Sequence, residues 1–294
     1  MPTSEYFTLK KISIKFFGKL ADKFSNNFIA LKHALVTARA RVLFRTYLSI
    51  AFFFSFIVFL FTFVFTLVVS INLGLNLAFT LFGLIVVPLF FSSLTFFLLF
   101  IYPFTISKSR KTDIEANLPF ALTHMAAISE SGAPPLTIFK ILSQFKEYGE
   151  LAKEAKEITR DVEVFGLDEI SALRECASKS PSSEFKDVLE GMITTIQSGG
   201  SLKSYLIEES GKAMFEYTVK RERYNQVLST YADIYTALLI AAPMTFIVVL
   251  AALNIMGGSL FGLTTQNLMI LGTIAIAGLN LIFLAFLCLT QPKM

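Results

Sequence analysis

The sequence predicts an all-α, polytopic membrane protein in which two transmembrane hairpins, four helices in total, flank one cytoplasmic helical bundle. Charged residues make up 16% of the chain and leave two blocks of 62 and 59 residues, 46–107 and 234–292, without any Asp, Glu, Lys or Arg. A membrane span needs about 20 apolar residues, so each block has the length of a hairpin of two spans. Residues 108–233, between the blocks, are charged and show helical periodicity without sustained alternation.

The first block is predicted to form two helices joined by a short loop. Residues 47–71 are almost entirely apolar, residues 72–76 read Asn-Leu-Gly-Leu-Asn, and the apolar run resumes over 77–102. Asparagine and glycine between two apolar runs are typical of a turn. Pro88 lies inside the second run, where we expect a kink that a membrane helix tolerates.

The second block is predicted to form the other hairpin. Its two spans cover 234–256, which includes Pro243, and 268–289, and the residues between them are small and polar. Neither hairpin contains a charged residue. Charges inside a span usually mark proton or ion pathways, so their absence argues against a proton-coupled transporter.

Lysine and arginine residues border the two hairpins at their outer ends, and the loops within the hairpins lack them. The bordering residues are Arg39, Arg41, Arg45, Lys108, Arg110, Lys111, Lys220, Arg221, Arg223 and Lys293. Positively charged flanks stay on the cytoplasmic side of a membrane. We therefore predict a multi-pass protein of the cell membrane with both termini and residues 108–233 in the cytoplasm.

Residues 1–45 are predicted to form a basic amphipathic arm. They carry nine Lys and Arg against two acidic residues, whereas residues 108–233 carry 16 basic and 20 acidic residues. Apolar residues recur every three or four positions over 9–35, as on one face of a helix. Such an arm can lie on anionic membrane lipids or pack on the protein's own acidic domain, and both placements remain open. A nucleic-acid partner is not expected beside a membrane anchor.

Residues 108–233 are predicted to form a bundle of about six helices, with boundaries set by capping residues and glycines. The expected N-caps are Asp113, Asp168, Ser180 and Ser201. The expected breaks between helices are at Gly132, Gly166, Gly199 and Gly200. A helix opens at Pro134-Pro135, and the last helix continues into the third span.

No motif for catalysis or for cofactor binding occurs in the chain. A phosphate-binding loop, His-Glu-x-x-His and Gly-x-Ser-x-Gly are all missing. We therefore predict a protein that is not an enzyme and binds no cofactor or metal. Cys176 and Cys288 are expected to be unpaired, reduced thiols. The acidic residues of 147–163 alternate with Lys and Arg, which predicts a solvated, ion-paired helix face rather than a cation site.

Three segments, taken together in order, resemble a known family. They are residues 117–135, from Asn-Leu-Pro-Phe to Gly-Ala-Pro-Pro; residues 161–173 with Ser-Pro-Ser at 180–182; and residues 196–202, Ile-Gln-Ser-Gly-Gly-Ser-Leu. Their order and spacing resemble the type II secretion system F domain family. This family comprises platform proteins of type IV pilus-like machines, including tight-adherence and archaellum members. The sequence of residues 166–173 is most similar to archaeal members of this family.

The resemblance implies a platform at the base of a filament. Such a platform binds a cytoplasmic secretion ATPase and transmits its motion to prepilin or pilin subunits, without hydrolysing anything itself. Many members of the family carry two copies of the domain, whereas this chain shows one. The resemblance therefore implies a homodimer or pairing with a paralogous platform subunit.

Eight residues are candidates for the ATPase contact or for hinges: Gly132, Glu150, Glu154, Glu157, Gly166, Asp168, Gly199 and Gly200. For the glycines, turn geometry alone is an alternative explanation. Two other classes of function make different demands on the spans. A membrane transporter or channel component with a cytoplasmic regulatory domain needs polar groups along its spans. An intramembrane enzyme needs a nucleophile and a base in the bilayer, where this chain has no His, Asp or Glu.

Overall fold

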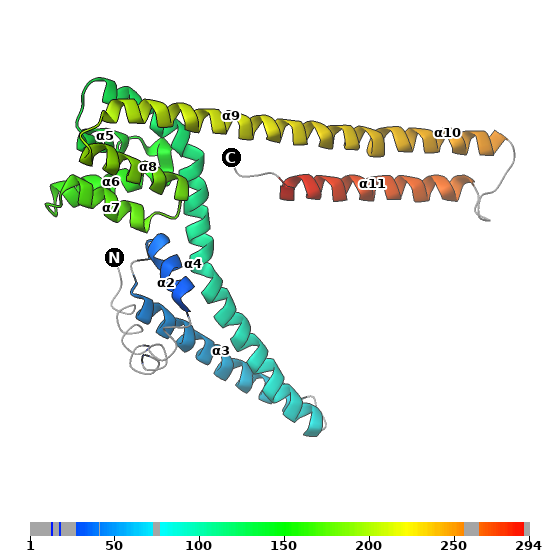
Figure 1. Ribbon diagram of the computed structural model, residues 1–294. Helices are drawn as coiled ribbons and strands as arrows, with labels where there is room; N and C mark the ends of the chain where they lie inside the picture. Colours follow the sequence, from blue (N-terminus) through cyan, green and yellow to red (C-terminus); the bar gives the residue numbers. More distant parts are fainter. Residues whose placement is uncertain are drawn as a thin grey trace. The chain divides into compact units, whose positions relative to one another are not determined.

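The computed structural model describes residues 13, 18, 28–40, 42–72, 77–255 and 265–290. Within these ranges every regular element is a helix and no residue lies in a β-strand, which confirms the all-α prediction. The chain divides into two compact units, residues 1–210 and residues 211–294 (Figure 1).

The first unit contains a hairpin of two long helices, α3 (Phe44–Asn72) and α4 (Leu77–Glu130), preceded by the short α2 (Ile29–Thr37). The rings of Phe52 and Phe96 stack across the hairpin with centroids 5.2 Å apart. Ser92 Oγ donates a hydrogen bond of 3.0 Å to the carbonyl of Ser55. Helices in lipid associate through close packing and interhelical hydrogen bonds of this kind. Figure 1 shows α4 continuing past the start of α3 into the helical bundle.

The continuity of α4 shows that the predicted N-cap at Asp113 is wrong. α4 runs unbroken for 54 residues and contains Pro88, Pro103 and Pro119. Asp113 lies within it, and its carboxylate accepts the backbone N–H of Glu150 at 2.6 Å. Asp113 therefore caps α6, a helix that begins 36 residues later in the chain, so local sequence carries no sign of the pairing.

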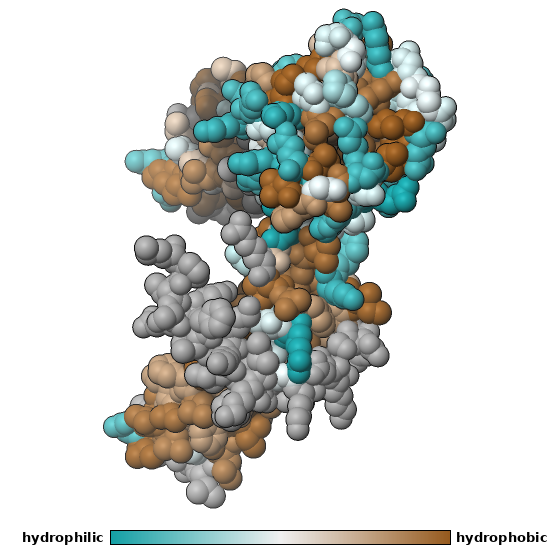
Figure 2. Space-filling view, turned by 90° about the vertical axis from the view of Figure 1, so that its left-hand side faces the viewer, coloured by the Kyte–Doolittle hydropathy of each residue, from teal (hydrophilic) through white to brown (hydrophobic). Residues whose placement is uncertain are grey.

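Among the residues that the structure describes, four helices are long and apolar enough to cross a membrane: Phe44–Asn72, Thr80–Glu130, Leu202–Ala252 and Gln266–Phe286. Large apolar side chains point outward from them; Phe61, for example, is 71% exposed and Phe82 is 68% exposed. A surface of this kind is unfavourable in water and suits lipid. On the face in Figure 2, hydrophobic side chains dominate the α3–α4 hairpin, whereas hydrophilic ones are mixed over the bundle. The chain is thus a multi-pass membrane protein.

The bundle consists of the C-terminal part of α4, α5 (Pro135–Leu142), η2 (Lys146–Tyr148), α6 (Gly149–Glu163), α7 (Glu169–Lys179), α8 (Ser183–Gln197) and the start of α9 (Leu202–Tyr235). Its core is mainly aliphatic. The fully buried side chains include Ile114, Leu122, Met125, Ile138, Phe139, Leu142, Leu151, Leu173, Phe185, Leu189, Met192 and Leu206. They recur at helical spacing along each element, as the periodicity predicts.

The ends of these helices mostly follow the predicted capping residues. Asp168 accepts the N–H of Ile170 at 3.2 Å, and Ser201 Oγ accepts the N–H of Ser204 at 3.2 Å. Ser180 is not the cap of α8, because it ends α7 and Pro181 separates the two helices. Ser182 caps α8 instead, accepting the N–H of Phe185 at 3.3 Å.

The second unit contains most of α9 together with η3 (Thr236–Ala241), α10 (Ala242–Ile255) and α11 (Thr265–Thr290). Tyr235 and Phe283 pack α9 against α11 with ring centroids 5.3 Å apart. η3 is a π-helical turn that ends two residues before Pro243. Proline removes an N–H and collides with the carbonyl four residues earlier, and a π turn relieves this conflict without ending the helix. The bundle's last helix thus runs into the third span, as predicted.

Candidate functional site

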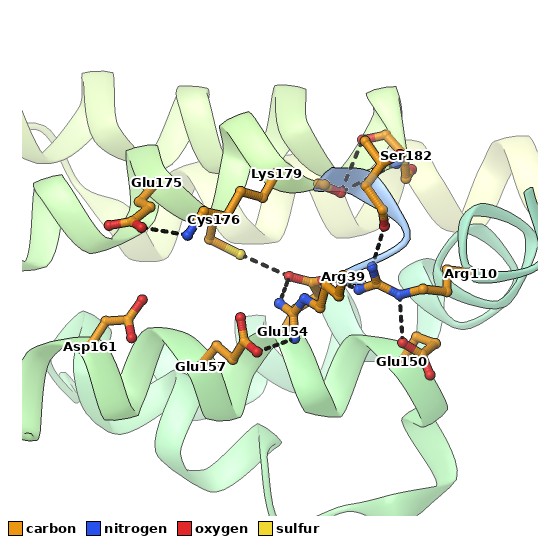
Figure 3. Close-up of polar contacts among 12 residues, drawn as sticks. Arg39, Arg110, Glu150, Glu154, Glu157, Asp161, Glu175, Cys176, Lys179 and Ser182 are labelled. Atoms are coloured by element: carbon orange, nitrogen blue, oxygen red, sulfur yellow. Dashed lines mark hydrogen bonds and ion pairs between the residues drawn. The ribbon is translucent and has the colours of Figure 1, made fainter. Parts of the chain in front are cut away.

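Five charged side chains join the end of α2 to α4 and α6, and we call them the arm–bundle network (Figure 3). Arg39, just after α2, contacts Glu154 and places Nη1 2.7 Å from Glu157 Oε1. Arg110 of α4 donates from Nε to Glu150 Oε2 at 2.8 Å and from Nη2 to Glu154 Oε1 at 2.6 Å. Each oxygen of Glu154 therefore contacts a different arginine. Arg110 also donates to the carbonyl of Thr37, so it fixes the end of α2 directly.

Glu154 is the buried centre of this network, which corrects its predicted place on a solvated helix face. Its side chain is 0% exposed, whereas that of Glu157 is 33% exposed. Glu154 lies three residues after Leu151 and four before Ile158, both of which are buried. This spacing puts it on the apolar face of α6. A carboxylate there needs cationic partners, and the two arginines supply them.

Arg39 adopts a backbone conformation that is rare for its residue type. Its φ is +51°, and no other non-glycine residue in the described ranges has a positive φ. Arg39 and Ala40 close the end of α2 with N–H bonds to Val36 and Leu35 of 3.0 and 3.1 Å, a geometry in which glycine is usual. The left-handed conformation costs about 1 kcal/mol. The ion pairs with Glu154 and Glu157 oppose that cost, so the side chain holds the backbone in place.

Cys176 of α7 extends the network. Its Sγ donates to Glu154 Oε2 at 3.2 Å. Burial, together with the adjacent Glu154 carboxylate, raises the pKa of the Cys176 thiol well above its usual value, so the thiol stays protonated. Burial also raises the pKa of Glu154, against the opposing charges of Arg39 and Arg110. At Glu150 burial acts in the same direction, but hydrogen bonds from Lys153 and Arg110 outweigh it and lower the pKa.

The Cys176 thiol is therefore expected to report on the integrity of the network. In a Cys288→Ser background, N-ethylmaleimide should label Cys176 slowly, because the thiol is buried and protonated. The substitution Arg39→Ala should raise the labelling rate at least about tenfold, because α2 no longer holds Glu154 in place. Glu175→Gln, at an exposed ion pair on the same helix, is the matched control and should leave the rate unchanged. Equal rates in the Arg39 and Glu175 variants would contradict this role for the network.

Apolar contacts beneath the network hold α2 against the hairpin. Leu31 and Leu35 are buried together with Leu48 of α3. Phe28 packs on Phe100 of α4 with ring centroids 5.6 Å apart. Of the two placements open for the basic arm, its described end therefore packs on the protein itself. Except for residues 13 and 18, residues 1–27 lie outside the described ranges.

The remaining candidate residues lie at helix ends and do not join the network. Gly132, Gly166 and Gly199 have φ of +75°, +68° and +71°, whereas Gly200 is outside the left-handed region. Gly166 and Asp168 belong to the α6–α7 turn (residues 164–168), where Val164 is 70% exposed and Phe165 is 65% exposed. The guanidinium of Arg160 lies 5.4 Å from the Phe165 ring centroid. Exposed apolar groups of this kind on a hydrophilic domain are typical of a contact surface.

Comparison with known proteins bears on the same region. The model of the family described as "Type II secretion system (T2SS), protein F" matches residues 121–250. The match covers 130 of the 294 residues, so this part of the chain is similar to that family. The match confirms the resemblance predicted from the three sequence segments. It includes Glu150, Glu154, Glu157 and Cys176, whereas Arg39 and Arg110 precede it. The arm–bundle network thus joins the matched region to the segments before it.

Proteins from two archaea are similar to part of this chain. Flagella accessory protein J of Methanocaldococcus jannaschii is 31% identical over 137 residues, which are 46% of this chain and 24% of that protein. Flagella accessory protein J of Methanococcus voltae is 30% identical over 137 residues, 46% of this chain and 25% of that protein. Uncharacterized protein MJ1286 of M. jannaschii is 30% identical over 129 residues, 42% of this chain and 22% of that protein. The chain thus spans about a quarter of the length of these relatives. No solved structure matches it.

Proposed function

We propose that this chain is a membrane assembly platform of a type IV pilus-like filament or type II secretion machine. The observation that carries the proposal is a T2SS protein F match in a helical bundle from which membrane-spanning helices leave at both ends. In this role the chain couples a cytoplasmic secretion ATPase to the assembly of prepilin or pilin subunits. It performs no catalysis, and its bundle and both termini lie in the cytoplasm.

The helical connections suit a protein that transmits movement. α4 is continuous over 54 residues from the membrane into the bundle, a length of about 80 Å at 1.5 Å per residue. The arm–bundle network fixes α6 to the base of the first hairpin through buried charges. A push on the bundle would therefore move α4 and the hairpin together. The breaks at Gly132, Gly166, Gly199 and Gly200 are the positions where we propose that helices pivot.

We place the ATPase contact at the α6–α7 turn and the neighbouring α8–α9 break. Glu154 is buried and cannot serve as a docking residue, and Glu150 and Glu157 are engaged with Arg110 and Arg39. Phe165 and Val164, in contrast, are exposed and flanked by Gly166 and Asp168. A symmetric filament base also leads us to propose pairing with a second copy or with a paralogous subunit.

The proposal is tested by a pull-down of the full-length protein, purified in detergent, with a secretion ATPase from the same cell. We expect binding at modest salt and no ATP turnover by the platform alone. Phe165→Ser should weaken binding about tenfold, because an exposed aromatic anchor carries much of a contact's energy. Phe215→Ser, at an aromatic residue on α9 that is 70% exposed, is the matched control. No binding by the full-length protein would reject the coupling role and favour a transporter or channel component.

A further inference from the structure

An open cavity of about 1060 Å³ lies beside the arm–bundle network, entirely within the first unit. Its walls come from the end of α2, the cytoplasmic end of the α4 span, the charged face of α6 and the last residue of α7. The positively charged residues that line it are Arg39, Arg110, Lys153, Lys156, Arg160 and Lys179. Only two acidic residues, Glu150 and Glu157, line it with them. The lining therefore favours an anion.

The cations of this cavity fall into two groups. Arg39 and Arg110 are held by the buried Glu154 and form the floor of the cavity. Lys153, Lys156 and Arg160 follow at spacings of three and four along α6, so they share one exposed face of the helix. Lys179 faces them from α7.

Lys153, Lys156, Arg160 and Lys179 form the rim of the cavity. The ion pairs that these cations already make compete only weakly with an incoming anion. Lys153, Arg160 and Lys179 pair with Glu150, Asp161 and Glu175, at 2.5, 3.0 and 2.5 Å, while the three cationic side chains are 65%, 49% and 43% exposed. Lys156 makes no ion pair with any residue that the structure describes. Exposed pairs contribute little to stability, so these side chains can turn to an anion without a large loss.

The cavity also has an apolar wall at the level where the spans end. Leu35, Val36 and Ile106 line it, and the uncharged block of the first hairpin ends at residue 107. Leu35 belongs to the same buried cluster as Leu48 of α3. A cationic rim above an apolar wall, next to a membrane, matches an amphiphile with a negatively charged head. A soluble anion would make no use of the apolar wall.

We propose that this cavity binds the phosphate headgroup of an anionic membrane lipid, with the start of its hydrocarbon chain along Val36 and Ile106. The phosphate oxygens accept hydrogen bonds from Lys156, Arg160 and Lys179, as cationic donors prefer. A lipid seated there bridges α2, α6 and α7, so it stabilises the same contact as the arm–bundle network. The site does not depend on the proposed platform function, and its test needs neither an ATPase nor a pilin.

The test measures lipid binding to the full-length protein in detergent, as the rise in its melting temperature during titration. Phosphatidylglycerol should stabilise the protein saturably, while phosphatidylcholine with the same acyl chains should not. The double variant Lys156→Gln/Arg160→Gln should bind phosphatidylglycerol about 30-fold more weakly, because it loses two cations near the headgroup. Lys186→Gln, at an exposed ion pair on α8 away from the cavity, is the matched control and should bind normally.

Two further arms separate this site from other sources of attraction. Lys10→Gln/Lys11→Gln removes two cations of the basic arm and should keep the saturable response to phosphatidylglycerol. Inorganic phosphate alone should stabilise the protein at least 100-fold less effectively, because it lacks the hydrocarbon chain. Equal responses to both lipids, or an unchanged affinity in the Lys156/Arg160 variant, would overturn the proposal. Saturation by inorganic phosphate at the lipid's concentration would also overturn it, in favour of a soluble phosphate.

Discussion

Replacing Glu154 with alanine should lower the free energy of unfolding by about 3–5 kcal/mol, because it removes the acidic partner shared by two arginines. Among the described residues, Arg110 would remain largely buried with Glu150 as its one acidic partner, and Arg39 would keep the more exposed Glu157. Arg39 would also retain its positive φ without the contact that offsets the cost of that conformation. The measurement is unfolding of the full-length protein in mixed micelles on titration with sodium dodecyl sulfate, followed by helical circular dichroism.

The matched control for this prediction is Glu157→Ala on the same helix. Its pair with Arg39 is partly exposed on both sides, so we expect a loss of less than about 1 kcal/mol. Comparable losses in the two variants would show that burial of Glu154 does not set the energy of the network. The double variant Glu154→Ala/Arg39→Ala should lose less unfolding free energy than the sum of the two single variants, because the Glu154 and Arg39 side chains contact each other.

Gly149→Ala should lower the free energy of unfolding by about 3 kcal/mol for two independent reasons. Gly149 has φ +53° and ψ −118°, a conformation that an L-residue with a Cβ atom avoids. A Cβ atom there would also collide with Asp113 Oδ2. The methyl group would therefore displace the carboxylate that caps α6 at the N–H of Glu150. The same micelle titration measures the loss.

Gly211→Ala provides the opposite expectation in the same protein. Gly211 lies in α9 and has nothing within 4 Å of an added Cβ atom. Alanine at such a helical position should stabilise the protein by about 0.5–1 kcal/mol. If both alanine variants changed stability equally, neither the backbone conformation of Gly149 nor its contact with Asp113 would matter.

The features that sequence predicts well here are those that depend on neighbours along the chain. The uncharged blocks gave the four spans, and Asp168, Ser201 and the glycines marked helix ends. Pro243 lies inside one continuous helix because the preceding π turn relieves the clash between the proline ring and the helix backbone. In these cases the partners lie within a few residues of each other, so spacing and residue type are informative.

The features that the sequence left undetermined depend on partners far apart in the chain. Asp113 accepts the N–H of Glu150, 37 residues away, and Arg39 contacts Glu154 across 115 residues. One local sign of the network was present, because an acidic residue at position 154 interrupts the apolar stripe of α6. An acidic residue on a buried helix face predicts a cationic partner but not its position in the chain. Arg39, Arg110 and Cys176 can be identified as partners only once the packing of α2, α4 and α7 is known.

The long separation between Arg39 and Glu154 also dictates an order of events during synthesis. The chain leaves the ribosome from its N-terminus, so Arg39, Arg110 and the whole first hairpin exist before α6 is made. Until then Arg39 remains solvated, and no ion pair with Glu154 or Glu157 stabilises the left-handed conformation at the end of α2. Docking of the nascent bundle onto an already inserted hairpin closes the contact. The arm–bundle network can therefore form only after the first hairpin has been made, when a later segment of the same polypeptide supplies Glu154.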